Sequence, residues 1–373
     1  MKRQLFPLGK AYGKAFCNRV EETKLLLGNI QSGKHTLLIA PRRYGKSSLA
    51  EKAIHESKLP SIKANFHLCT SEEEVTDLIK QSVIELIGIS IGKVNTLLPL
   101  LQKFLKTLHP KISFYKDAAT LELISDADEN NAVIISETLL MLDKLLGEKN
   151  KRAVIFFDEF QEISNISKSF SIEGAIRTAA QELQNLSLVF SGSIRSLLLN
   201  MFEDEARPLY KLCRKIHLKR ISEEDYAKHI QKIAKETWGG LLSDEALKQI
   251  FSSSNCHPYY INYLCDTLWQ LSEKLPSAEG VRRAWKQVLV EEWSDAVREI
   301  SGLPMVQRRL MKHIAKVDGL DLMSRTTGWT LMLAASSISS ALGALVEKDY
   351  IEQVDDGGYY QIINPLLRAA LKN

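Results

Sequence analysis

The sequence predicts an α/β fold with a parallel sheet, followed by a helical region and a small C-terminal domain. Two observations support this prediction. Up to about residue 218, short apolar runs alternate with helical patterns, which is typical of parallel strands joined by crossover helices. From residue 222 the pattern is helical until two strand-like runs flank an Asp-Asp-Gly-Gly turn. The composition is globular, because 45% of the 373 residues are hydrophobic and 25% are charged.

The predicted strands of the first region are short and almost continuously apolar, so we expect them to be buried on both faces. They are Thr36–Ala40, Ser61–Leu68, Ala153–Phe157, Ser187–Phe190 and Lys215–Leu218. Helices are expected between them, at Val20–Gln31, Lys46–Ser57, Glu72–Gly88 and Ile172–Gln184. Residues 93–151 are long for a connection, so we expect an insertion with a helix, a hairpin and a helix, at Thr96–Leu108, Lys111–Leu123 and Ile134–Leu146.

The expected domains are an α/β core over residues 1–221, a helical subdomain over 222–299 and a C-terminal domain over 300–373. Ser222, Ser243 and Pro258 are helix-start signals in the second domain. In the third, helices are expected at Pro304–Lys316 and Ser336–Glu347, with a shorter one between them and strands at Tyr350–Val354 and Tyr359–Ile363. This order of three helices and a hairpin is the outline of a winged helix-turn-helix.

Composition argues against several classes of protein. The five cysteines are odd in number and show no C-x-x-C spacing, which disfavours a disulfide framework and a zinc site. Pro7 and Lys10 interrupt the N-terminus before a signal-peptide core forms, and no apolar run reaches the length of a membrane span. We therefore expect a soluble, cytoplasmic protein. The net charge of +4 permits a polyanionic partner without requiring one.

The sharpest motif follows the first predicted strand, where Gly45-Lys46-Ser47 opens a helix. A triphosphate is bound by inward-facing backbone N–H groups at a helix N-terminus, by a lysine on its β- and γ-phosphates, and by a hydroxyl on Mg²⁺. Gly45, Lys46 and Ser47 match these three requirements. Ala40 departs from the G-x-x-x-x-G-K-[ST] pattern, which has glycine at that position. The alternative is a surface turn that opens a basic helix.

An acidic pair supports the phosphate-binding interpretation. Asp158 and Glu159 end an apolar strand 112 residues after Lys46, and carboxylates at this end of a parallel strand lie where open α/β sheets bind ligands. Asp158 is the candidate for the Mg²⁺ shell and Glu159 for orienting the attacking water. The alternative is a solvated pair of acids. Another strand ends at Ser191-Gly192-Ser193, and either serine is a candidate for sensing the γ-phosphate or the water.

These motifs resemble the archaeal-type ATPase family of the AAA+/STAND branch of P-loop NTPases, which are distant relatives of origin-recognition and replication-initiator ATPases. The resemblance covers nearly the whole chain and implies an AAA+-like core, a helical lid, a C-terminal winged helix, and ATP with Mg²⁺ as cofactors. The stretches that carry it are Phe16–Glu22, Ala40–Ser48, Asp158–Gln161, Gly192-Ser193, Leu209-Tyr210 with Arg214, and Asn255–Tyr260.

The resemblance also implies roles for individual residues. Asn18 and Arg19 would contact adenine or ribose, and His257 and Pro258 would close over the nucleotide. The loop contacts would come from Ala40, Pro41, Arg42, Arg43, Tyr44, Gly45, Lys46, Ser47 and Ser48. From the residue types alone, the alternative role for His257 is that of a helix N-cap. Ala40 and Cys256 stand where the family usually has glycine, and we expect this departure to affect turnover more than binding.

An arginine finger is expected before the last core strand, where a side chain could reach a neighbouring subunit. Arg207 and Arg214 precede that strand and are the candidates, and Arg214 is assigned to the catalytic set with Lys46, Asp158, Glu159 and Ser193. The alternative for each arginine is an ordinary surface residue. A nucleotide-dependent oligomer is compatible with such a residue but is not determined by it.

The C-terminal domain leaves two partners open, double-stranded DNA and a protein. From residue 301 to 373 it carries eight basic and seven acidic side chains, a net charge of only +1. Its expected recognition helix, residues 336–347, offers serines but no arginine, asparagine or glutamine for base edges. We therefore predict an ATP-hydrolysing molecular switch that acts through this domain. The alternative is an ATP-modulated DNA-binding regulator with little turnover.

Overall fold

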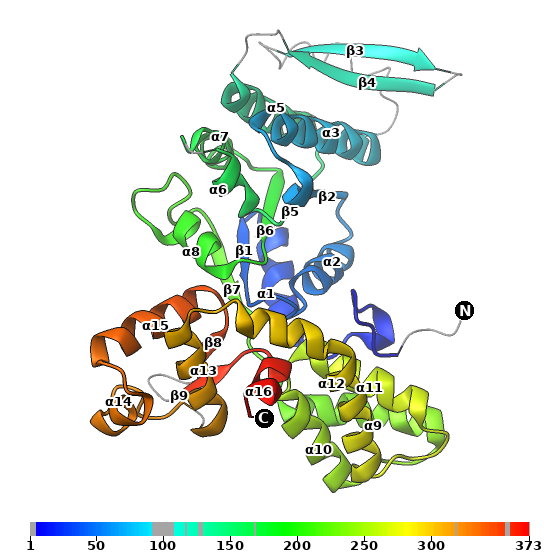
Figure 1. Cartoon of the computed structure of the whole chain (residues 1–373). Coiled ribbons are helices and arrows are strands. Elements are labelled where there is room, and N and C mark those ends of the chain that lie inside the picture. Colours follow the sequence, from blue (N-terminus) through cyan, green and yellow to red (C-terminus); the bar gives the residue numbers. More distant parts are fainter. Residues whose placement is uncertain are drawn as a thin grey trace. The chain divides into compact units, whose positions relative to one another are not determined.

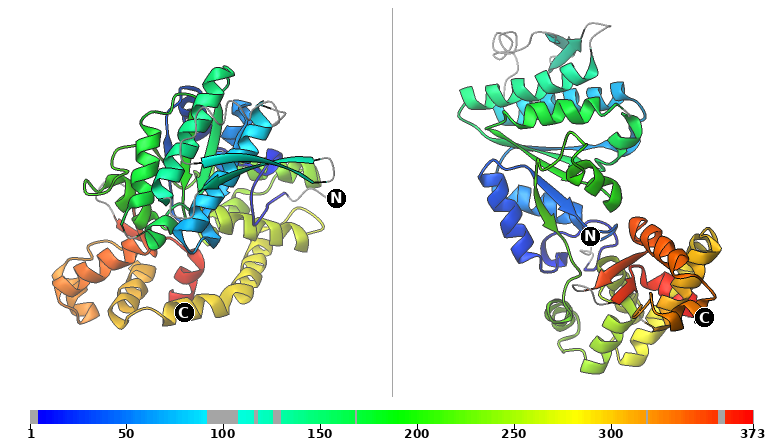
Figure 2. Two further views of the ribbon diagram at one scale, coloured as in Figure 1. Left: turned by 90° about the horizontal axis from the view of Figure 1, so that it is seen from above. Right: turned by 90° about the vertical axis from the view of Figure 1, so that its left-hand side faces the viewer.

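The computed structural model describes residues 5–91, 108–115, 118–125, 130–167, 169–317, 319–354 and 359–372 (Figures 1 and 2). The chain divides into two compact units. The first, which we call the sheet unit, comprises Val20–Ala40 and Lys46–Leu218. The second, the helical unit, comprises Met1–Arg19, Pro41–Gly45 and Lys219–Asn373. The predicted phosphate loop therefore passes from the sheet unit into the helical unit and back.

The sheet unit is built on a parallel sheet with the strand order β2-β5-β6-β1-β7. Its strands are β1 (Thr36–Ile39), β2 (Ser61–Asn65), β5 (Ala153–Asp158), β6 (Leu186–Ser191) and β7 (Arg214–His217). The three central strands are buried throughout, as expected. The expectation of full burial is wrong for β2 and β7, most of whose side chains are partly or fully exposed, because these two strands form the sheet edges.

Helices cover both faces of this sheet (Figures 1 and 2). Within the sheet unit these are α1 (Val20–Gln31), α2 (Lys46–Ser57), α3 (Glu72–Ile91), α5 (Asn131–Glu148), α6 (Glu162–Ile166), α7 (Ser171–Ala180) and α8 (Arg195–Glu203). The bounds of α1 and α2 match the sequence prediction. The main core lies on the face covered by α3, α5 and α7, where side chains such as Phe157, Phe160 and Phe190 pack against these helices.

Three predictions in this unit need correction. The 3-10 turn η2 (Phe66–Leu68) follows β2 at Asn65, so the strand predicted over Ser61–Leu68 is too long. Helix α7 ends at Ala180, before the predicted Gln184. Helix α5, which we expected in an insertion, buries nine side chains and packs between α3 and α7, so it belongs to the core.

The rest of the expected insertion is only partly described. The hairpin is confirmed, since β3 (Leu108–Tyr115) pairs antiparallel with β4 (Ala118–Ser125). The predicted helix Thr96–Leu108 lies outside the described residues, except for Leu108, which begins β3.

The helical unit begins with the short 3-10 turn η1 (Gly13–Ala15) and resumes with α9 (Glu223–Trp238), α10 (Asp244–Ser254), α11 (Pro258–Leu271) and α12 (Ala278–Ser301). The predicted start signals are confirmed. Ser222 and Ser243 accept hydrogen bonds from the first turns of α9 and α10, and Pro258 is the first residue of α11. Helix α12 continues through the predicted boundary at residues 299 and 300.

The C-terminal elements form a further core of their own. They are α13 (Met305–Val317), α14 (Arg325–Leu331), α15 (Ala335–Glu347), the antiparallel strands β8 (Ile351–Val354) and β9 (Tyr359–Ile362), and α16 (Pro365–Lys372). The predicted order of helices and hairpin is observed, followed by a last helix that we did not expect. The turn at residues 355–358 lies outside the described residues, and the winged helix-turn-helix assignment stays a prediction.

Among the described residues, no single helix has the length and apolar character to cross a membrane. Helices α14 and α15 pass this test only as a pair, by length and composition, with a bend of 83° between them.

Candidate functional site

Lys46 lies at the start of α2, where the predicted phosphate loop returns to the sheet unit. Its side chain is buried, and Nζ donates a hydrogen bond of 2.9 Å to the carbonyl oxygen of Ala40. Ala40 directly follows β1, so this bond ties the beginning of the loop to its end. The first N–H groups of α2 have no partners within the helix, and together with the ammonium they favour an anion at this position.

Ser47 and Asp158 meet next to this helix start. The Ser47 hydroxyl donates to Oδ2 of Asp158 at 3.2 Å, and Asp158 is the last residue of β5. The hydroxyl of Ser191, which ends β6, donates to the other carboxylate oxygen. The structure therefore brings α2, β5 and β6 together at the carboxyl edge of the sheet, as the sequence spacing predicted. Ser48, on the next position of α2, is buried.

A residue that we did not predict also contacts Asp158. The ammonium of Lys63, on β2, forms an ion pair with Oδ2 of Asp158. Burial by itself raises the pKa of Asp158, but the hydrogen bonds from Lys63, Ser191 and Ser47 and the charge of Lys63 outweigh it. The pKa of Asp158 is thus held below its ordinary value, and the carboxylate is ionised at neutral pH.

Glu159 is held by a second set of donors. Its Oε2 accepts hydrogen bonds from the backbone N–H of Ser193 at 3.0 Å, from the Ser193 hydroxyl at 2.7 Å and from Nε2 of Gln161 at 2.7 Å. The sequence singled out Ser193, and the structure places it against Glu159. The sequence places Gln161 in the same motif as Glu159 but assigns no role to it. The structure makes it a fixed donor, because its side chain is completely buried.

Gly192 is required for this arrangement. A Cβ atom on Gly192 would lie 1.8 Å from Oε1 of Gln161, a distance at which two atoms cannot coexist. The glycine between Ser191 and Ser193 therefore leaves room for the Gln161 amide beside the chain after β6. From that position the amide reaches Glu159.

The donor set suits Mg²⁺. Magnesium prefers oxygen ligands and is commonly held by one or two carboxylates together with substrate phosphates. Ser47 and Asp158 supply a hydroxyl and a carboxylate side by side. Among the described residues, no group of three or more His, Cys, Asp or Glu side chains is placed so that it could hold a metal ion by itself. The residues present thus fit a metal that arrives with phosphate groups.

Two of the five loop residues of the helical unit are buried within that unit. Pro41 and Tyr44 are buried, whereas Arg42 and Arg43 are exposed, and the Arg43 guanidinium lies 4.2 Å from the centre of the Tyr259 ring. Gly45 has φ of +88°, a conformation that strains any residue with a side chain. The glycine predicted to face the phosphates is therefore also required by the backbone.

Tyr44 is the centre of a cluster that includes the C-terminal hairpin. Its ring lies edge-on to His257, with centroids 5.0 Å apart, and its hydroxyl donates to Glu352 of β8 at 3.2 Å. Arg220 donates from Nε to the same carboxylate at 2.8 Å and from Nη2 to the carbonyl oxygen of Ile363 at 3.0 Å. The sequence did not indicate Arg220 or Glu352, because no local pattern links residues this far apart.

The residues that the resemblance assigns to the base, the ribose and the lid all belong to the helical unit. Asn18 and Arg19 both have positive φ, and Nη2 of Arg19 donates to the backbone oxygen of Tyr44 at 3.4 Å. His257 is the N-cap of α11, where it accepts from the N–H of Tyr259, and Pro258 follows it. The alternative role of His257, that of a helix N-cap, is therefore observed.

The pKa of His257 is unusual. Burial, followed by the positive charges of Arg220 and Arg43, lowers the pKa of His257 from 6.5 to about 3. The imidazole is thus neutral at physiological pH. A neutral ring can accept the hydrogen bond that caps α11.

The two arginine-finger candidates have different positions. Arg214 is the first residue of β7 and is paired with Thr36, the first residue of β1, so it lies at the sheet edge opposite Lys46. The catalytic assignment of Arg214, as an arginine finger that reaches a neighbouring subunit, stays a prediction. Arg207 is not available as a finger in this structure, because it forms a buried ion pair with Glu173.

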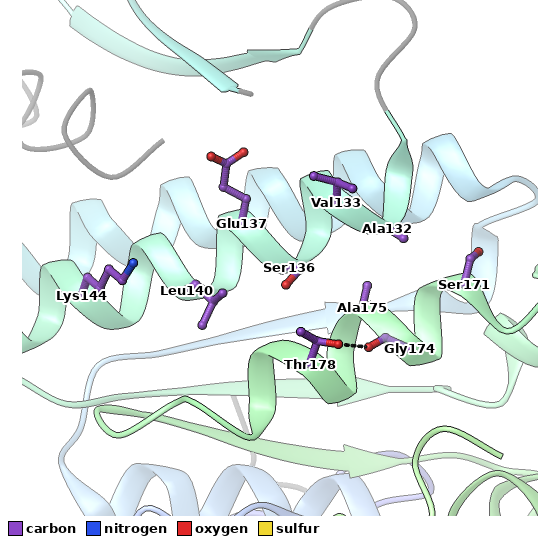
Figure 3. A pocket seen from close by; sticks show the side chains of 10 residues that line it. All are labelled: Ala132, Val133, Ser136, Glu137, Leu140, Lys144, Ser171, Gly174, Ala175 and Thr178. Atoms are coloured by element: carbon purple, nitrogen blue, oxygen red, sulfur yellow. Dashed lines mark hydrogen bonds between the residues drawn. The ribbon is translucent and has the colours of Figure 1, made fainter. Parts of the chain in front are cut away.

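The described part of the sheet unit includes two sizeable hollows. One, of about 790 Å³, lies beside edge strand β2 and is lined by Glu51, Lys63 and Phe156 among others. The other, of about 550 Å³, lies between α5 and α7, where Leu140, Ala175 and Thr178 contribute to its lining (Figure 3). The sequence predicted neither.

Comparison with solved structures identifies the fold. The Walker-type ATPase PABY2304 of Pyrococcus abyssi matches with a TM-score of 0.68 and 16% identity over 99% of this chain and 100% of that one. The ORC2 protein of Aeropyrum pernix matches in its ADPNP–ADP form with a TM-score of 0.59 and 13% identity, over 99% and 96% of the two chains. Its ADP form matches with a TM-score of 0.55 and 13% identity, over 100% and 99%.

The resemblance predicted from the motifs is thus confirmed at the level of the fold. No protein-family model matches the sequence, and no curated relative matches it either.

Proposed function

Because the chain has the fold of an archaeal Walker-type ATPase, we propose that it binds ATP with Mg²⁺ and hydrolyses it as a STAND-type AAA+ molecular switch. The observation that carries the proposal is the hydrogen bond between Ser47 and Asp158. It joins the helix start of the phosphate-loop motif to the acidic end of β5, although 111 residues separate them. Lys46 and Glu159, their direct neighbours in sequence, complete a set that matches the chemistry of phosphate transfer.

Binding draws on groups already placed at this edge. The ammonium of Lys46, now on the Ala40 carbonyl, exchanges that acceptor for β- and γ-phosphate oxygens, which carry more negative charge. Ser47 and Asp158 would hold Mg²⁺, which neutralises charge on the phosphates when it is bound. Contacts of Asn18, Arg19, His257 and Pro258 with the rest of the nucleotide are part of the proposal.

Hydrolysis is assigned to Glu159. A water oxygen attacks the γ-phosphorus, the bond to the β,γ-bridging oxygen breaks, and the products are ADP and phosphate. The proton lost by the water passes to the Glu159 carboxylate and then to phosphate or solvent. Oε2 of Glu159 accepts three hydrogen bonds from Ser193 and Gln161, so we assign the water to Oε1.

Coupling to the C-terminal domain is supported by the contacts of Tyr44. This loop residue lies between the phosphate-loop proline and glycine, and its hydroxyl bonds to Glu352 in the hairpin. A nucleotide that changes the loop changes the energy of this contact, and such a difference is what a ligand needs to shift a conformational equilibrium. The C-terminal domain, which we take to be a winged helix, is thereby the output element.

The proposal is tested with three proteins, the wild type, Lys46→Ala and Glu159→Gln. Calorimetry with ATP and Mg²⁺ should show binding by the wild type and by Glu159→Gln, and none by Lys46→Ala. Phosphate release should fall by about 100-fold or more in Glu159→Gln, the usual loss when a general base is removed. Lys52→Ala, which removes a partly exposed lysine of the same helix, is the control. Equal loss of binding and turnover in Glu159→Gln would contradict the assigned roles.

The DNA-binding alternative is tested by gel shift over a series of salt concentrations. Specific duplex binding that weakens steeply with salt and changes with ATP, with negligible phosphate release, would replace the switch enzyme by the ATP-modulated regulator. Steady phosphate release without DNA supports the switch.

A further inference from the structure

Lys63 is a cation at the place where the proposed function needs Mg²⁺. It lies on edge strand β2, and its ammonium forms an ion pair with Oδ2 of Asp158. Ser47 donates its hydroxyl to this same oxygen. The lysine and the hydroxyl therefore share one acceptor on the carboxylate that we assign to the metal.

The strand register explains how Lys63 reaches Asp158. Lys63 is paired with Phe156 on the adjacent strand β5, and Asp158 is two residues further along on the same face. The ammonium of Lys63 lies over the Phe156 ring, with Nζ 5.2 Å from the ring centre. The lysine is thus directed along the sheet towards its carboxyl edge.

A second carboxylate lies close to the ammonium. Oε1 of Glu51, on α2, is 3.9 Å from Nζ of Lys63. Both side chains border the hollow of about 790 Å³ beside β2, so the lysine has space on the Glu51 side. Asp158, in contrast, is almost completely enclosed, with a side-chain exposure of 8% against 29% for Lys63.

The lysine and a metal ion cannot both occupy this position. A divalent cation bound by Ser47 and Asp158 would lie within a few ångströms of the ammonium, and like charges at this distance repel strongly. Without any cation, however, Asp158 would be a buried charge whose partners are all neutral, namely two hydroxyls and the backbone N–H of Glu159, which is costly. The site therefore needs one cation at a time.

We propose that Lys63 is the resident cation of the metal-free site, which holds Asp158 in position and yields Oδ2 to the incoming Mg²⁺ by moving to Glu51. This inference rests on the proposed function, because that function supplies the Mg²⁺. Lys63 is a positioning residue, and the Mg²⁺ affinity of the protein reflects competition between the metal and the lysine.

The test compares Mg²⁺ requirements in the full-length chain. Half-saturating Mg²⁺ is measured from the binding of a fluorescent ATP analogue at fixed nucleotide. Lys63→Met removes the competitor and should lower half-saturating Mg²⁺ by about tenfold, the factor that about 1.4 kcal/mol produces. Glu51→Gln removes the second acceptor and so keeps the lysine on Asp158. This variant should therefore raise half-saturating Mg²⁺. Lys63→Arg should have nearly the same half-saturating Mg²⁺ as the wild type. The same holds for Lys52→Met, because Lys52 pairs with Glu56.

A second readout does not depend on the nucleotide. Binding of Mn²⁺ alone, followed by electron paramagnetic resonance, should be tighter in Lys63→Met than in the wild type. Without metal, Lys63→Met should also unfold at a lower temperature than the wild type, because Asp158 has lost its cation. Added metal should narrow that difference.

The outcomes separate the two proposals. If no variant binds the nucleotide but Lys63→Met binds Mn²⁺ more tightly than the wild type, the proposed function fails and the role of Lys63 stands. If the wild type binds nucleotide and Lys63→Met has the same Mg²⁺ and Mn²⁺ requirements, the role of Lys63 is overturned. If Lys63→Met does not fold, Glu51→Gln decides, because an unchanged Mg²⁺ requirement in that variant also overturns it.

Discussion

The hydroxyl of Tyr44 donates a hydrogen bond to the carboxylate of Glu352, although 308 residues separate them in the sequence. Tyr44 belongs to the phosphate-loop motif, and Glu352 belongs to the first strand of the C-terminal hairpin. Arg220 donates to the same carboxylate and lies 5.9 Å from the centre of the Tyr44 ring. One residue of the loop is thus fixed by a charged pair from the C-terminal part of the chain.

Tyr44→Phe should change nucleotide affinity without removing any group that we assign to the phosphates. The bond to Glu352 holds the loop in one conformation, so its loss changes the free energy of that conformation and should shift ATP affinity by about three- to tenfold. Calorimetry measures the change. Tyr210→Phe is the matched control, because its hydroxyl bonds to the exposed Glu205. If both variants bind ATP like the wild type, Tyr44 does not couple the loop to the hairpin.

Gly192→Ala should destabilise the sheet unit. The new Cβ would meet Oε1 of Gln161 at 1.8 Å, so the amide must move and Glu159 loses one of its donors. We expect a loss of about 1–3 kcal/mol in the free energy of unfolding, as for other overpacked sites, together with slower phosphate release. Urea unfolding and a phosphate assay measure the two effects.

The control for this variant is Gly174→Ala, on α7. Nothing lies within 4 Å of a Cβ atom built there, and alanine is the better helix former, so its stability should be unchanged or higher. If Gly192→Ala is as stable and as active as Gly174→Ala, Gln161 does not hold Glu159 in the way described.

Arg207→Met should be among the most destabilising single changes in the sheet unit. Glu173 has no exposed surface, and Arg207 contacts it from Nε at 3.2 Å and through a second bond from Nη2. Burial raises the pKa of Glu173, and Arg207 counteracts that shift. Removing the arginine leaves a buried carboxyl without its partner, at a cost of about 3–5 kcal/mol.

Urea unfolding of three variants tests this pair. Arg207→Met combined with Glu173→Gln should recover a large part of the lost stability, because the buried charge is gone as well. Glu173→Gln alone should be intermediate. A loss below about 1 kcal/mol in Arg207→Met, the level of a surface pair, would show that the two residues do not depend on each other.

Acidification should destabilise the protein through His257. Its folded pKa is about 3, whereas an unfolded histidine titrates near 6.5, so the unfolded state binds more protons between these values. The contribution of His257 to the free energy of unfolding is therefore complete above pH 6.5. It is lost as the pH falls towards 3, at about 1.4 kcal/mol per pH unit.

His257→Asn isolates this contribution, because asparagine can still cap α11 but does not titrate. Between pH 7 and pH 5 the wild type should lose about 2 kcal/mol more stability than the variant. Urea unfolding at both pH values gives the comparison. Parallel losses in the two proteins would mean that the ring is not buried as a neutral group beside Arg220 and Arg43.

The sequence by itself determined the features that depend on neighbouring residues. Gly45-Lys46-Ser47 opens a helix after a strand, Ser222 and Ser243 cap helices, and Asp158 ends a buried strand, because turns, caps and apolar runs act over a few residues. These signals also predicted that Ser47 and Asp158 would meet, since parallel strands bring their carboxyl ends to one edge.

Only the tertiary structure decided which strands form the edges and which distant side chains share an acceptor. Lys63 belongs to no motif, yet its place on β2 next to β5 brings its ammonium to Asp158. No sequence pattern predicts the ion pair between Arg220 and Glu352 either. The physical reason is that strand order and packing depend on the free energy of the whole core, whereas a sequence pattern records only local preferences.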